Sequence, residues 1–96
     1  MSIRVEQFEG KNGPVKNQFR ITAPKGTVFQ SYGTIIAFRP YDGKVILDEN
    51  YWDYSTTTGK YRNIFLREDK ATTEKKIKDG RYILANLNDD SIDFGF

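Results

Sequence analysis

The chain has 96 residues, which is enough for one small domain and too few for two. It contains no cysteine and no histidine, which excludes disulfides, thiolate chemistry and the histidine-dependent arrangements of nucleophilic enzymes. The 15 lysines and arginines and 13 aspartates and glutamates give a net charge of +2, too balanced to indicate nucleic-acid binding by itself. No apolar run approaches the roughly 20 residues that span a bilayer, and the N-terminus lacks the apolar core of a signal peptide. We therefore expect a single domain, residues 1–96, in the cytoplasm and away from membranes.

Turn-forming residues recur at short intervals in the first half of the chain, as in GKNGP, APKG and RPYDG. Such spacing is typical of consecutive antiparallel strands. Phe19, Ile21 and Ala23 alternate with polar residues, which indicates a strand with one wet face. The run from Ile35 to Phe38 does not alternate, so we expect a central strand covered on both faces. The predicted strands are 3–8, 17–23, 27–32, 34–39 and 44–48.

The pattern changes to helical after Tyr54. Ser55 and the three threonines that follow are good N-caps, because a short side-chain oxygen can accept from a backbone N–H two or three residues later. Tyr61, Ile64 and Phe65 then recur at helical spacing, which predicts the main helix at about 56–67. A shorter second helix is predicted at about 73–79, with Thr72 or Thr73 as its cap and Gly80 after its end.

The end of the chain returns to strand-like alternation. Tyr82 to Leu87 predicts another strand, and Ile92, Phe94 and Phe96 alternate with small or polar residues in the tail. Three apolar side chains in a free tail would be an aggregation hazard, so we expect them to be buried. The expected arrangement is a last strand of the domain's own sheet facing the main helix, which favours a monomer; the alternative is a homodimer through this strand.

These elements predict an α+β domain with a small, curved antiparallel sheet of about six or seven strands, open or half-closed into a barrel. One main helix packs across the sheet, and a short second helix accompanies it.

Four segments resemble a family of small, largely uncharacterised proteins encoded by tailed bacteriophages: NQFRI (17–21), KGTVFQSYGTIIAF (25–38), LDENYWDYSTTTGKYRNIFL (47–66) and KKIKDGRYILANLN (75–88). The resemblance covers the chain from Asn17 to Asn88 and is most distinctive in YWDYSTTTGKYRNIFL. It implies a phage accessory protein in the cytoplasm of the host cell, and it supplies no catalytic residues. The first ten residues and the tail SIDFGF lie outside it.

The aromatic cluster Tyr51, Trp52 and Tyr54 admits two interpretations. The residues could form a stacking platform for bases or an anchor for a protein partner, since aromatic side chains offer large, rigid contact area. Alternatively, Trp52 belongs to the core, the tyrosines cover the sheet edge, and Asp53 with the hydroxyl residues holds a strand-to-helix corner. The second interpretation is the more common one for such a segment and still leaves one or two exposed tyrosines.

The cations are concentrated between Lys60 and Arg81. This segment contains eight lysines and arginines and four acidic residues. A positive stripe here would suit phosphate groups, whereas a charge-rich short helix is more often a solvated face. With the two tyrosines, these cations give the candidate binding residues: Tyr51, Tyr54, Lys60, Arg62, Arg67, Lys75, Lys76, Lys78 and Arg81.

The sequence contains few features that indicate catalysis or cofactor binding. Asp48, Glu49 and Asp53 lie close together, as do Asp89, Asp90 and Asp93, but neither group has the spacing of a calcium loop. GKNGPVK lacks the full phosphate-loop pattern. We therefore predict no metal, no cofactor and no enzymatic activity.

The function we expect is binding of a host or phage protein, with blockage of a host defence system as one role that fits a phage setting. The alternative is binding of nucleic acid or nucleotide phosphate through the 60–81 cations and neighbouring tyrosines. Salt dependence separates the two, because phosphate contacts weaken steeply with salt.

Overall fold

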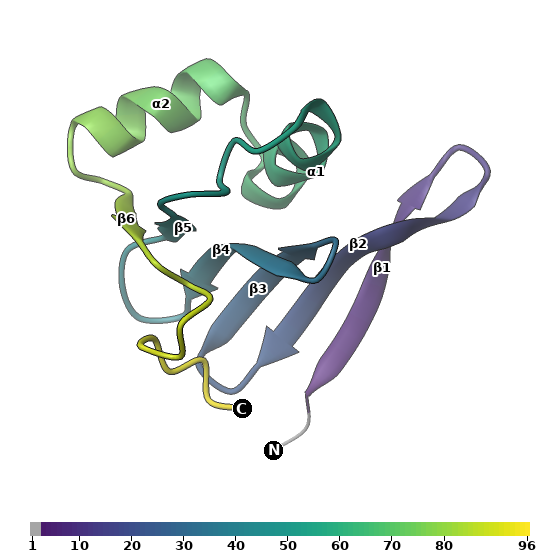
Figure 1. Cartoon of the computed structure of the whole chain (residues 1–96), viewed down its shortest axis with the longest axis horizontal. Helices are drawn as coiled ribbons and strands as arrows, with labels where there is room; N and C mark the ends of the chain where they lie inside the picture. The colour runs from purple at the N-terminus through teal and green to yellow at the C-terminus, as the bar shows by residue number, and fades with distance from the viewer. Residues whose placement is uncertain (1–2) are drawn as a thin grey trace.

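Six strands form one open sheet in the order β1-β2-β3-β4-β5-β6 in the computed structural model, which describes residues 3–96. All neighbouring strands are antiparallel except β5 and β6, which are parallel. Two helices lie between β5 and β6 in the chain and cross over one face of the sheet (Figure 1). The elements are β1 (Arg4–Gly10), β2 (Gly13–Ala23), β3 (Gly26–Ser31), β4 (Thr34–Pro40), β5 (Ile46–Asp48), α1 (Thr56–Leu66), α2 (Lys70–Lys78) and β6 (Ile83–Ala85).

The predicted α+β class with a curved, mostly antiparallel sheet is confirmed. The prediction that all strand pairs are antiparallel is wrong for one pair, β5 and β6. Because α1 and α2 return the chain over the sheet, β6 arrives beside β5 in the same direction, as parallel pairing requires.

Helix α1 starts where the hydroxyl-rich segment predicts. Ser55 is its N-cap, with extended backbone, and its hydroxyl accepts from the Thr58 N–H at 3.1 Å. The helix ends at Arg67, whose left-handed backbone lets its N–H donate to the last-turn carbonyls. Tyr61 and Phe65 are buried as predicted. Ile64 is exposed, because the stripe facing the sheet runs through positions 58, 61, 62, 65 and 66.

Helix α2 begins three residues before its predicted start. Its N-cap is Asp69, whose carboxylate accepts from the Thr72 N–H at 2.8 Å, so neither threonine is the cap. Thr73 is instead fully buried and its hydroxyl donates to Glu68 at 2.6 Å. Ile77 packs against the core, as predicted, and the backbone turns at Gly80.

The sheet is covered on both faces, as the unbroken apolar run of β4 predicts. On the helix side, a cluster of buried residues is formed by Phe8, Phe29, Ile36, Ala37, Leu47, Tyr61, Phe65 and Leu66. A bulge in the β3–β4 pairing lets the consecutive Ile36 and Ala37 both join this cluster. On the opposite face, Val28, Phe38, Leu87 and Phe94 form a second cluster.

The C-terminal tail does not form a strand and does not face α1. Residues 86–96 cross the opposite face of the sheet (Figure 1), where the Phe94 ring packs edge-on against Phe38 at 4.8 Å between centroids. Ile92 is partly buried there and Phe96 is exposed. The prediction of burial within the same domain is confirmed for Phe94, whereas the predicted face was wrong because helices already fill the other side.

Candidate functional site

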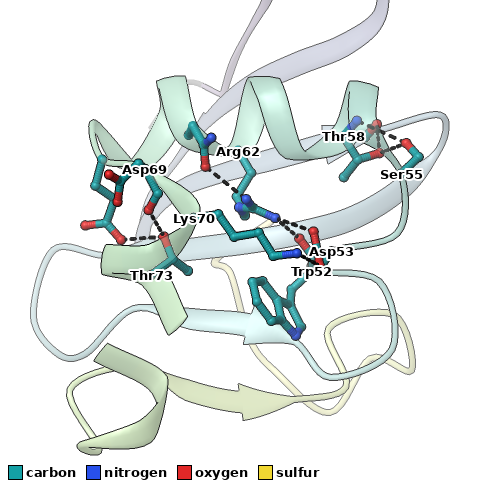
Figure 2. Close-up of polar contacts among 11 residues, drawn as sticks. Trp52, Asp53, Ser55, Thr58, Arg62, Asp69, Lys70 and Thr73 are labelled. Atoms are coloured by element: carbon teal, nitrogen blue, oxygen red, sulfur yellow. Dashed lines mark hydrogen bonds and ion pairs between the residues drawn. The ribbon is translucent and has the colours of Figure 1, made fainter. Parts of the chain in front are cut away.

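The corner between β5 and α1 is held by a buried arginine (Figure 2). Arg62 points from α1 toward the preceding loop, where it donates to the Trp52 carbonyl at 2.9 Å and to Asp53 at 3.1 Å. Its guanidinium also lies over the Trp52 ring, 5.2 Å from the centroid. Lys70 of α2 reaches the same carboxylate at 2.6 Å. Asp53 therefore joins both helices to the loop.

These contacts show that the prediction of Arg62 as a binding residue is wrong, and they explain the position of Trp52. The Arg62 side chain is only 1% exposed and already has protein partners, so it belongs to the interior and not to a binding surface. Trp52 is partly buried against the helix-side core, which agrees with the interpretation of a structural corner. Burial alone would raise the pKa of Asp53, but hydrogen bonds from Lys70 and Arg62 outweigh it and lower that pKa.

The remaining predicted cations do not form one stripe of available charge. Lys76 is paired with Glu68 at 2.7 Å, and Arg81 is paired with Asp79 at 2.8 Å. Lys60, Arg67, Lys75 and Lys78 are exposed. Lys60 lies on α1 and the other two lysines lie on α2, so the segment contributes scattered charges from separate elements.

Glu68 should make the protein sensitive to acid. Its carboxylate accepts from Lys76, Thr73 and Tyr82, the last at 2.9 Å. Burial acts to raise the pKa of Glu68, but these hydrogen bonds overcome it and hold the pKa below its usual value. Because the folded-state pKa is the lower one, the stabilisation is present above the unfolded pKa of about 4.3 and is lost as pH falls through the folded value.

We therefore expect Glu68→Gln to reduce the free energy of unfolding at pH 7 more than at pH 3. Urea unfolding of both proteins at the two pH values measures the difference. A difference that stays constant between pH 7 and pH 3 would contradict the assigned role of this carboxylate.

Three exposed tyrosines meet at the end of the sheet nearest the start of α1. Tyr32, Tyr51 and Tyr54 are 58%, 38% and 68% exposed. They line a hollow of about 270 Å³ together with Ser31, Thr34, Ile36 and Thr58. Tyr51 and Tyr54 are in edge-to-face contact, with 5.5 Å between ring centroids. We call Tyr32, Tyr51 and Tyr54 the tyrosine surface.

The backbone holds each of these tyrosines in place. Tyr32 and Gly33 form the tight β3–β4 turn with positive φ angles of 52° and 81°. A positive φ is uncommon for a bulky residue, and the side chain of Tyr32 at this position in the turn is exposed. The Tyr51 N–H donates to the buried Asp48 carboxylate at 2.9 Å, and the Tyr54 N–H donates to the Tyr51 carbonyl.

The buried residues that line the hollow are the apolar Ile36 and two hydroxyl residues, Ser31 and Thr58. The hydroxyls of Ser31 and Thr58 are 3.0 Å apart, and the Ser55 hydroxyl donates to Thr58 at 3.1 Å. These hydrogen bonds connect the end of β3 to the first turn of α1. A partner side chain entering the hollow would meet the tyrosine rings, the apolar Ile36 and the hydroxyl groups of Ser31 and Thr58.

The predicted Tyr51 and Tyr54 are thus brought together, and the structure adds Tyr32. The sequence placed Tyr32 at the end of a strand, 19 residues before Tyr51. Gly33, directly after Tyr32 and between two strand-like runs, was the available signal, since glycine there indicates a turn. Tyr32 lies near Tyr51 and Tyr54 because the first turn of α1 packs against the end of β3, which the sequence does not show.

A second hollow, of about 790 Å³, lies beside α1 and contains Asp53, Lys60, Arg62 and Lys70. Its charges are largely satisfied internally, because Arg62 and Lys70 both bind Asp53. Within residues 3–96 no group of three or more acidic residues is placed to hold a metal ion. In the same range, no helix has the length and apolar character needed to cross a membrane.

The structure is that of a small α+β domain with an aromatic surface at one end of its sheet. Residues 3–81 match a family of unknown function (DUF8033), and because this segment includes most of the chain, the protein belongs to that family. The match spans β1 to β5 and both helices, and it ends before β6 and the tail. No curated protein and no solved structure matches the chain.

Proposed function

We propose that the protein is a non-catalytic binding protein that holds a protein partner at the tyrosine surface. The observation that supports this most directly is the convergence of Tyr32, Tyr51 and Tyr54 around one hollow. Exposed tyrosines cost little side-chain entropy on binding and are enriched among the residues that dominate protein interfaces. Aromatic residues make up 15% of the chain, and these three are not used to build the core.

The size of the hollow favours a protein side chain over a free small molecule. Its volume of about 270 Å³ is below the roughly 300–1,000 Å³ of pockets that enclose drug-sized ligands. We propose that the partner inserts one apolar or aromatic side chain between the tyrosines. The surrounding aromatic area then contributes by excluding water.

The sequence resemblance supports a setting for this activity. We propose an accessory protein of a bacteriophage that acts in the host cell cytoplasm on a host or phage protein. Blocking a host defence system is one role that such binding would serve. The packing of Phe94 on its own sheet supports a monomer over a homodimer formed by the C-terminal segment.

The double substitution Tyr51→Ala/Tyr54→Ala is expected to abolish partner capture, since each tyrosine at the centre of an interface contributes on the order of 2 kcal/mol to binding. Tyr41→Ala is the matched control, because Tyr41 is 65% exposed and lies in the loop after β4, outside the tyrosine surface. The measurement is affinity capture from infected cells with all three proteins, followed by titration of the purified pair at two salt concentrations.

Two results would contradict the proposed function. One is capture that survives Tyr51→Ala/Tyr54→Ala as well as it survives Tyr41→Ala. The other is recovery of nucleic acid alone, with binding that disappears at high salt, which would favour phosphate contacts.

A further inference from the structure

Three arginines lie close enough to act on one another's charge near the end of α1 opposite the tyrosine surface. Arg20 belongs to β2, Arg39 to β4, and Arg67 is the C-cap of α1. Only Arg67 was among the residues predicted from the basic 60–81 segment. The other two come from the predicted strands, so the group forms only when the sheet and the helix pack together.

The strand register places Arg20 and Arg39 on the helix side of the sheet. Arg20 pairs with Phe29, which pairs with Ala37, and both partners belong to the helix-side core. Arg39 is two residues beyond Ala37 on β4 and so points to the same face. Phe65 of α1 lies beside Phe29, with 5.8 Å between ring centroids, which places the end of α1 over these strands.

Aromatic rings hold two of the guanidinium groups. The Arg20 guanidinium carbon is 4.8 Å from the centroid of Phe8, and that of Arg39 is 4.8 Å from the centroid of Phe65. Phe29 lies between the two rings and contacts both. A guanidinium stacked on a ring keeps its N–H edge available for an oxyanion, and stacking reduces the entropy lost on binding.

The two acids nearest this group in the sequence and in the sheet are each paired with another cation. Glu68, which follows Arg67 in the chain, forms an ion pair with Lys76. Glu6, which is opposite Arg20 on β1, forms an ion pair with Arg4 at 3.5 Å. Among residues 3–96, none of the three arginines forms an ion pair. Burial lowers the pKa of Arg39, and the positive charges of Arg67 and Arg20 lower it further. Arg39 is therefore repelled by the charges of Arg67 and Arg20.

We propose that Arg20, Arg39 and Arg67 bind the phosphate groups of a nucleic-acid backbone, at a site separate from the tyrosine surface. An anionic ligand would relieve the repulsion among the three cations. Because Phe8 and Phe65 hold Arg20 and Arg39 on different rings, the guanidiniums present separate contact points. Separate points match charges that repeat along a phosphodiester chain better than they match one small anion.

A purely structural role is the competing explanation. Arginine stems cover apolar rings, and cations near a helix C-terminus interact favourably with its dipole. Both effects would keep the arginines where they are without any ligand. The test must therefore measure nucleic-acid binding against a variant that removes the same charge elsewhere.

The experiment is a fluorescence-anisotropy titration of the full chain with a labelled single-stranded 12-nucleotide DNA at several salt concentrations. The variants are Arg20→Gln/Arg39→Gln and the charge-matched control Lys75→Gln/Lys78→Gln, which removes two exposed cations of α2. We expect the arginine variant to bind at least ~10-fold more weakly at 50 mM salt and the control within ~3-fold of the unmodified protein. The salt slope should fall by about 1.4 for the arginine variant, since each single-strand phosphate contact contributes about 0.7.

The exposed Arg67 provides a second variant in case the first one unfolds. Arg67→Gln keeps the rings covered by Arg20 and Arg39, and we expect it to weaken binding by at least ~3-fold. The proposal is overturned if the unmodified protein does not bind the DNA at 50 mM salt, or if the lysine control loses as much affinity as the arginine variant. It is also overturned if a polyglutamate peptide of equal charge competes as well as the DNA, because the site would then be one for acidic protein segments.

Discussion

Replacing Phe94 with alanine is expected to lower the free energy of unfolding by about 3 to 5 kcal/mol, the usual cost of removing a buried phenylalanine ring. The ring is 8% exposed and packs against Phe38 on the sheet face opposite the helices. Val28 and Leu87 complete the same cluster. Without the ring, Phe38 would lose its edge-on aromatic contact on this face of the sheet. Urea or thermal unfolding measures the effect.

Phe96→Ala is the matched control for Phe94→Ala. Phe96 is 63% exposed and two residues further along the same tail, and its ring lies 5.5 Å from that of Phe94, so its removal should cost only the aromatic contact, at most about 1.5 kcal/mol. Equal losses for the two variants would contradict the described packing of the tail. A loss confined to Phe94 would support the intramolecular cover that the structure describes.

Replacing Asp48 with alanine should be at least as damaging. Its fully buried carboxylate accepts four hydrogen bonds, from the N–H groups of Asn50, Tyr51 and Leu87 and from the side chain of Asn88. The substitution leaves these donors without an acceptor, at roughly 1 to 3 kcal/mol for each donor that stays buried. We expect a total loss of about 3 kcal/mol or more in the free energy of unfolding.

Glu49→Ala controls for the loss of a neighbouring negative charge. Glu49 follows Asp48 directly and is exposed, so its removal should leave stability within about 0.5 kcal/mol of the unmodified protein. Because Asp48 also holds the Tyr51 N–H, its loss should weaken partner capture as well as stability. Asp48→Ala with unchanged stability would show that the loops after β5 and β6 do not depend on this carboxylate.

Most of the fold could be predicted because it follows from local patterns. The alternation at Phe19, Ile21 and Ala23 indicated β2, and the unbroken apolar run indicated the doubly covered β4. The hydroxyl-rich segment gave the start of α1 at Ser55. These signals depend on residues within a few positions of one another, which is the range over which propensity and periodicity act.

The parts that could not be predicted depend on contacts between distant segments. The side chain of Asn88 donates to the Ile35 carbonyl and accepts from its N–H, and so substitutes for a strand partner 53 residues away. The tail covers the face that the helices leave open, and no local pattern specifies which face that is. Arg62 was predicted to be a surface cation, because charge alone does not show that a side chain is buried beside a partner such as Asp53.

Each of the two candidate sites also combines residues that a local pattern indicates with residues that only the fold brings near them. Tyr51 and Tyr54 stood out because they are adjacent aromatics in a polar segment, whereas Tyr32 joins them only through the β3–β4 turn. Arg20 was predicted on the wet face of its strand, and Arg39 at the end of a strand expected to be covered on both faces. The sheet register and the end of α1 bring them beside Arg67. Helix α1 thus separates an aromatic surface at its start from a cationic one at its end.

Site-specific photo-crosslinking would show whether a protein partner binds at the tyrosine surface. A benzophenone amino acid is placed at position 54 or, as a control, at the equally exposed position 41, and the protein is irradiated inside infected cells. The proposed function predicts one discrete protein adduct from position 54 that is absent from position 41 and is lost when Tyr51→Ala is added. The same adducts from both positions, or none from position 54, would contradict it.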